Sequence, residues 1–399
     1  MAQNIRRPKL AVLANTYRFH LHTQHILDRL LFGYGWGGVY YHPSLDVVSL
    51  YVEQREEGDL SSQRAKQYPG MKIYSSVAEA LTLGTGKLAV DGVVYIGEQG
   101  NYPRNEKGQT LYPRYQFFDK VREVFRSSGK TVPYFTDKHL SWNWEWAKDM
   151  YDSSRKMGFP MMAGSSLTVT WRHPQIEMPS NANIGEAVCV AYGNVDSYDI
   201  HALEAVQCMV ERRKGAETGV EWLQAYRGDS FWQAMERGVW SPALFKTALC
   251  RSQTLRCARE TFTAAYPTID EMKALARNPV AYHYQYKDGL RCTIMLMSGL
   301  IEDFNFAADI VGQPKPFSTL MYLSHGTQLA TLETYFSPLV HYMEQFFQTG
   351  QEPYPLERVL LATGLTCAGV DSLFQGQQRL QTPQLSIQYK PSESTLRTT

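Results

Sequence analysis

The sequence places a lysine between an aspartate and a histidine at the end of a short apolar run. Residues 132–135 (VPYF) have β-strand character, and Asp137, Lys138 and His139 follow almost at once. A lysine at the carboxyl edge of a sheet, partly withdrawn from water, can have a lowered pKa and act as an acid, a base or an electrostatic clamp. The alternative is a surface lysine after a strand. His139 can hydrogen-bond a substrate or cap the next helix.

Three histidines within six residues form a second candidate site: His20, His22 and His25. His22 and His25 are three apart at the start of a predicted helix and can share a face. Such a tract is typical of metal binding, so a divalent metal is one hypothesis. The alternative is that the histidines hydrogen-bond a phosphate or a substrate individually.

Strands and helices alternate over the first 165 residues. Apolar runs at 9–14, 45–52, 90–96, 132–135 and 161–163 read as strands, and residues 21–32, 115–126 and a segment from 144 have helical periodicity. This alternation predicts a Rossmann-like, doubly wound parallel sheet over residues 1–165. Its polar tips would meet at the carboxyl edge, where open α/β sheets bind ligands.

From residue 166 the pattern changes. Lys287-Asp288-Gly289 lies between two strand-like runs, which is a strong hairpin signal. Further strand-like runs and helices predict an α+β domain with a mostly antiparallel sheet over residues 166–390. A polar stretch over 391–399 is expected to be a flexible tail.

This order of elements resembles the Gfo/Idh/MocA family of sugar-type oxidoreductases. In that family the fifth strand ends in Glu-Lys-Pro, where this chain has Asp137-Lys138-His139. Members often carry Asp-x-x-x-His-x-x-Asp in the second domain. Here His201 and Glu204 keep the His-x-x-acid spacing, Ser197 stands where the leading Asp is expected, and Asp199 is the nearest other carboxylate.

The resemblance implies an enzyme that transfers hydride between NAD or NADP and a hydroxyl of a sugar-like or cyclic polyol substrate. The catalytic residues would be Lys138, His201, Glu204 and Asp199. Lys138 would hydrogen-bond the reacting oxygen, and His201 would be the general base. Glu204, one turn further on, would orient the imidazole or the substrate.

The loop expected to hold the dinucleotide departs from the family. A Rossmann fingerprint needs G-x-G-x-x-G after the first strand, whereas residues 14–22 contain no glycine. Glu53, at the end of the second strand, is placed to bind a ribose diol or else is a solvated strand end. The residues expected to contact a cofactor are Asn15, Thr16, Tyr17, Arg18, Glu53, Gly97, Glu98 and Asp137.

A long polar loop, residues 97–114, follows the strand at 90–96 and is expected to be a substrate lid. The residues expected to contact a substrate are His139, Tyr102, Arg104, Lys107, Trp171 and Arg172.

The composition excludes several classes of partner. A formal charge of +1 provides no strong field for nucleic acid or an anionic membrane. No apolar run approaches the roughly 20 residues that span a bilayer. No signal peptide and no CxxC pair is seen, so a cytoplasmic protein with reduced thiols is expected. The resemblance implies a homo-oligomer, since family members generally pair through the open face of the second domain's sheet.

Two other functions fit the same pattern. The same cleft can catalyse a metal- or acid/base-assisted lyase, hydrolase or isomerase reaction on a sugar derivative. Glu98 would act there with His20, His22 and His25. The chain can also be a non-catalytic scaffold or sensor that has kept the fold.

Overall fold

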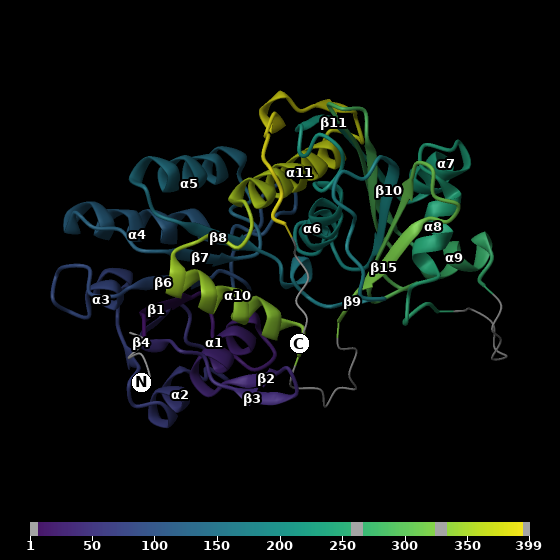
Figure 1. Cartoon of the computed structure of the whole chain (residues 1–399). Coiled ribbons are helices and arrows are strands. Elements are labelled where there is room, and N and C mark those ends of the chain that lie inside the picture. The colour runs from purple at the N-terminus through teal and green to yellow at the C-terminus, as the bar shows by residue number, and fades with distance from the viewer. Residues whose placement is uncertain (1–6, 257–265, 324–332, 394–399) are drawn as a thin grey trace.

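The structure is a computed structural model, and it describes residues 7–256, 266–323 and 333–393. Two sheets, each flanked by helices, form its two halves (Figure 1). The predicted tail lies outside the described residues from 394 onward. Within the described ranges, no helix is long and apolar enough to cross a membrane.

The first sheet is parallel throughout, with the order β5-β4-β1-β6-β7-β8. This confirms the Rossmann-like prediction. The strands are β1 (Lys9–Ala14), β4 (Asp46–Val52), β5 (Lys72–Ile73), β6 (Gly92–Ile96), β7 (Tyr134–Asp137) and β8 (Met161–Gly164). The helices between them are α1 (His22–Phe32), α2 (Ser61–Gln67), α3 (Val77–Thr82), α4 (Arg114–Ser128) and α5 (Trp144–Met157).

Local sequence explains where these helices begin and end. The Asn143 side chain accepts a hydrogen bond from the Trp146 amide and so caps α5. Gly158 ends the helix with φ +70°, a left-handed conformation that glycine adopts without a Cβ clash.

The second sheet is mixed, with the order β16-β11-β12-β13-β10-β14-β15-β9. Only the β10–β13 pair is parallel, and Asp288-Gly289 turns between β12 and β13 as predicted. The strands are β9 (Arg172–His173), β10 (Ile184–Ala191), β11 (Val220–Arg227), β12 (Val280–Tyr286), β13 (Arg291–Leu296), β14 (Phe304–Ile310), β15 (Phe317–Met321) and β16 (Leu380–Gln381). The sequence analysis missed β11, and a 3-10 turn, Pro383–Leu385, follows β16.

Helices cover both faces of this sheet. α6 (Asp199–Val210) and α11 (Leu356–Phe374) pack on the face toward the first sheet, and α7 (Asp229–Glu236), α8 (Pro242–Leu249) and α9 (Ile269–Leu275) lie on the opposite side (Figure 1). The outer face was expected to be open for subunit pairing. Instead it is buried in a core with residues such as Phe231, Trp240 and Phe245.

Two further elements complete the first half. A hairpin that the sequence analysis missed, β2 (Tyr34–Trp36) with β3 (Val39–Tyr41), follows α1. α10 (Phe336–Thr349) returns from the second half and packs against α1. Its apolar residues share the core of the first sheet, so a late segment of the chain forms one wall at the carboxyl edge of that sheet.

Candidate active site

A cavity of about 220 Å³ lies at the carboxyl edge of the first sheet, where the two halves meet. Side chains from both halves line it, including His22, Glu98, Lys138, Tyr198, His201 and Phe336. The volume is below the roughly 300–1,000 Å³ of pockets that bury drug-sized ligands, so it suits a molecule of about one sugar ring.

Lys138 is buried at this edge and carries a paired charge. Its Nζ donates to Glu98 Oε2 at 2.8 Å and to the Ser197 carbonyl at 3.3 Å. Arg114 holds the other oxygen of Glu98 and also donates to the Asp137 carbonyl at 2.7 Å. Burial opposes the charge of Lys138, but the Glu98 and Asp137 carboxylates outweigh it and raise its pKa. The lowered pKa that the sequence suggested is therefore wrong, and Lys138 is a cationic donor.

The same contacts keep Glu98 ionised. Burial alone would raise its pKa, but the cations of Lys138 and Arg114 reverse that effect and lower it. Lys138 adopts a left-handed backbone conformation (φ +61°), which is rare for a residue with a side chain. Its amide donates to the Gly164 carbonyl at 3.2 Å, so β8 holds this conformation in place.

His22 and Asp137 form a pair that the sequence analysis did not foresee. His22 Nδ1 lies 2.6 Å from Asp137 Oδ2, although the two residues are 115 positions apart. Asp137 is 1% exposed and His22 is 19% exposed. With Nδ1 donating to the carboxylate, Nε2 is the nitrogen left for a ligand in the cavity. A carboxylate that fixes an imidazole in this way is a common arrangement in acid–base catalysis.

His201 also reaches the cavity, but in a different electrostatic state. Its Nδ1 lies 2.5 Å from Ser165 Oγ. Burial, reinforced by the nearby charge of Lys138, lowers its pKa well below the ordinary value, so the ring is neutral. A neutral imidazole can hydrogen-bond a substrate hydroxyl, but it holds an abstracted proton poorly.

The two predicted acidic partners of His201 do not line the cavity. Glu204 is fully buried and accepts a 2.7 Å hydrogen bond from the Ser165 amide. It therefore acts on His201 only through Ser165. Asp199 is buried on the far side, where Tyr282 donates to it at 3.0 Å. Burial raises the pKa of Asp199 to about 6.

A Glu204→Gln variant is expected to flatten the pH dependence of stability. Burial raises the pKa of Glu204 from 4.5 to about 7. The protonated form is favoured in the fold, so its stabilisation is complete below pH 4.5 and is lost as the pH rises through about 7. The difference between these two pKa values corresponds to a loss of roughly 3 kcal/mol in the free energy of unfolding. Thermal unfolding at pH 5 and pH 8 measures the difference.

The matched control for Glu204 is the exposed Glu236→Gln, which should keep the wild-type pH dependence. An equal loss of stability between pH 5 and pH 8 in wild type and Glu204→Gln would show that Glu204 has no raised pKa.

Several of the residues predicted to hold a dinucleotide are hydrogen-bonded to other parts of the chain. Tyr17 is fully buried, and its hydroxyl donates to Asp28 at 2.5 Å. The Asn15 and Tyr17 carbonyls accept from the amides of Gln54 and Leu60, both at 2.8 Å. These bonds close the gap between the loop after β1 and the loop after β4.

The loop after β6 fills the remaining space. Tyr102 donates to the carboxylate of Glu53, the residue expected to bind a ribose, and the Asn101 amide donates to Gln54 Oε1 at 2.8 Å. A Cβ placed on Gly100 would lie 3.3 Å from the Thr16 methyl carbon. Contacts within this chain thus join the three loops at the sheet edge where such folds bind a pyrophosphate and its ribose.

The other predicted cofactor and substrate residues are scattered. Arg18 pairs with Glu56 near the surface at 3.4 Å. Lys107 pairs with Asp371 at 2.5 Å. Arg104 is exposed, His139 is buried without capping α5, and Trp171 stands between Trp36 and Tyr322. Arg172 is buried and donates to the Thr170 carbonyl at 3.1 Å. None of these six is among the residues that line the described cavity, and Gly97 is not either.

Arg114, at the end of the polar loop 97–114, begins α4, and Ser165 follows β8 directly at the predicted edge. Sequence reasoning missed two other residues of the site. Phe336 and Tyr335 come from the start of α10, and no local pattern indicated that they would reach this cavity.

No family model and no curated protein matches the sequence. Solved structures match it over nearly the full length. Myo-inositol dehydrogenase from Lactobacillus casei, in complex with NAD(H) and myo-inositol, has a TM-score of 0.55 at 10% identity and covers 94% of this chain and 97% of its own. Apo scyllo-inositol dehydrogenase from the same organism has a TM-score of 0.57 at 9% identity, with 95% and 99% covered.

A super-repressor mutant of Gal80p from Saccharomyces cerevisiae also matches, with a TM-score of 0.54 at 9% identity and 96% and 100% covered. The chain therefore has the Gfo/Idh/MocA fold. That fold is shared by proteins named as dehydrogenases and by one named as a repressor, so the fold by itself does not specify an activity.

Proposed function

We propose that this chain is an enzyme that moves a proton on a small sugar-like or cyclic polyol compound bearing a carbonyl group, without net oxidation. The observation that carries the proposal is that the His22–Asp137 pair and the Lys138 cation line one cavity. An oriented imidazole can abstract a proton next to a carbonyl, and a buried cationic donor beside it can stabilise the negative charge that develops on the oxygen.

The proposed step uses only residues of this chain. His22 Nε2 takes a proton from the carbon beside the carbonyl. The electron pair of that C–H bond forms the carbon–carbon double bond of an enolate, and the π pair of the carbonyl moves to its oxygen. Lys138 donates a hydrogen bond to the resulting enolate oxygen, whose charge it stabilises. His22 then returns the proton to the former carbonyl carbon, while the proton of the adjacent hydroxyl passes to the first oxygen, which gives an isomer. His201 would orient a hydroxyl of the substrate through its neutral ring.

Hydride transfer is the second candidate, and one observation favours it. Lys138 and His201, the two residues that the family resemblance implies for that reaction, reach the same cavity. The shared fold with a dehydrogenase solved with NAD(H) and myo-inositol adds support. A dinucleotide would require the loops after β1, β4 and β6 to separate.

Proton exchange into the substrate tests the proposal directly. The purified chain is incubated in D₂O, with no nucleotide, with aldoses, ketoses and keto-polyols, and the products are followed by NMR. The expected result is solvent deuterium at a carbon beside the carbonyl of at least one compound, and its loss in Lys138→Met. Turnover only with added NAD(P) would replace the proposal with hydride transfer. No turnover under either condition would favour a non-catalytic protein.

Nucleotide titration is expected to give no saturable change in tryptophan fluorescence with NAD(H) or NADP(H). The reason is that hydrogen bonds join the loops after β1, β4 and β6 to one another at the edge where a dinucleotide would bind. Saturable binding would contradict this expectation. In that case Glu53→Gln distinguishes specific from adventitious binding. The change should lower the affinity for a nucleotide whose ribose is held by Glu53, and it should leave adventitious binding unchanged.

A further inference from the structure

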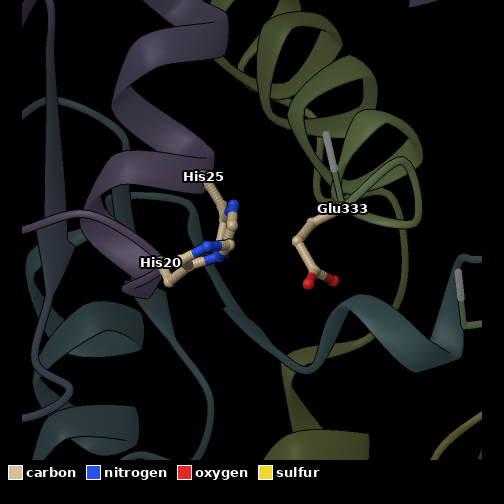
Figure 2. A group of neighbouring side chains, drawn as sticks. All are labelled: His20, His25 and Glu333. Atoms are coloured by element: carbon tan, nitrogen blue, oxygen red, sulfur yellow. The ribbon is translucent and has the colours of Figure 1, made fainter. Parts of the chain in front are cut away.

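The predicted histidine tract divides in two in the folded chain. His22 turns to Asp137, whereas His20 and His25 face Glu333, which precedes α10. One ring nitrogen of each histidine and a carboxylate oxygen of Glu333 all lie within 4.8 Å of one another. Figure 2 shows the two imidazole rings at the start of α1 and the Glu333 carboxylate across the same space.

His25 is the member of this group that most needs an explanation. It is 4% exposed, and its Nδ1 has no hydrogen-bond partner among the residues that the structure describes. A buried polar atom without a partner costs about 1–3 kcal/mol. The ring stacks on Phe336 at 5.0 Å between centroids, so packing fixes its orientation.

The backbones that carry His25 and Glu333 are tied together. Arg29 on α1 donates to the His25 carbonyl at 2.7 Å and to the Glu333 carbonyl at 2.9 Å. His20 is exposed and Glu333 is partly exposed, so both side chains have room to move. Three ligands at about 2.0–2.2 Å from one ion require only a small contraction of the present spacing.

We infer that His20, His25 and Glu333 form a binding site for a divalent transition-metal ion of the zinc type. Two imidazoles and one carboxylate suit Zn²⁺ and neighbouring transition metals, whereas Mg²⁺ and Ca²⁺ prefer sites made of oxygen ligands. Three protein ligands leave a fourth position for water or for an oxygen of a ligand.

The site would fasten α1 to the start of α10 beside the cavity. His22 lies between the two ligands His20 and His25 in sequence, and Phe336, which stacks on His25, lines the cavity. A bound ion would therefore fix the positions of α1 and the start of α10, two walls of the cavity, relative to each other. This inference is independent of the proposed proton transfer, since it concerns binding by residues outside that step.

Metal binding by the full chain tests the inference. Protein freed of metal by a chelator is titrated with Zn²⁺, and with Co²⁺ as a spectroscopic probe. One ion per chain and a higher melting temperature are expected. His20→Ala and Glu333→Gln change side chains that are not fully buried and should preserve the fold. Each should weaken binding by at least the 10–100-fold that is typical of losing an outer-shell partner.

The control is His42→Ala, which removes an exposed histidine outside the group and should leave the affinity unchanged. Failure to bind either ion at one per chain would overturn the inference. Binding that His20→Ala and Glu333→Gln leave intact would overturn it as well, because the ion would then occupy another site. The proton-exchange assay tests the proposed function alone, so the metal titration and that assay can fail independently.

Discussion

Replacing Asp137 with Asn is expected to lower turnover in the proton-exchange reaction by about 10²–10⁴-fold, the usual contribution of an acid–base residue. The variant has nearly the same shape, so the fold should persist. The amide can present its NH₂ group to His22 Nδ1, which favours the wrong tautomer and leaves Nε2 protonated and unable to accept a proton. Without the carboxylate, the imidazolium formed during the reaction also loses its counter-charge.

Asp137 acts through His22, so a structural readout must accompany the rate. In wild type the His22 Nδ1 proton, shared over 2.6 Å with Asp137, is expected to give a far-downfield NMR signal that disappears in Asp137→Asn. Asp46→Asn is the matched control, since it changes an exposed carboxylate at the start of β4, at the opposite edge of the same sheet. A rate within a few-fold of wild type for Asp137→Asn would remove His22 from the proposed role.

Replacing Arg358 with Met is expected to lower the free energy of unfolding by about 3–5 kcal/mol. Arg358 on α11 and Glu211 at the end of α6 are fully buried and joined by two hydrogen bonds of 2.9 and 2.5 Å. Tyr389 donates a third to Glu211 at 2.8 Å. Removing the arginine leaves a buried carboxylate without its cation, and the desolvation cost of that charge is the source of the loss.

Denaturant unfolding of three variants separates this explanation from simple loss of packing. Lys148→Met removes an exposed pair with Asp152 and should change stability by less than about 1 kcal/mol. The double variant Arg358→Met with Glu211→Leu removes both charges and should recover much of the loss. Equal losses in the single and double variants would mean that the buried charge is not the cause.

Much of the architecture was determined by local sequence. Alternating strand and helix periods predicted the parallel sheet, because backbone geometry makes a strand repeat every two residues and a helix every 3.6. Asp288-Gly289 predicted its hairpin because few residues accept the backbone angles of such a turn. Lys138 was found because a polar residue that ends a parallel strand must lie at the ligand-binding edge. β11 and the helices over the outer sheet face were not predicted.

The pairing of side chains was decided only by the tertiary structure. Asp137 was predicted as a cofactor contact and His22 as a metal ligand, yet the fold joins them into one pair. Glu333 meets His20 and His25 only because α10 returns to the first half of the molecule. Sequence showed that glycines were missing from the nucleotide loop, but not that three loops bond to one another across the crevice. Such contacts depend on where distant segments pack, and no local period encodes that.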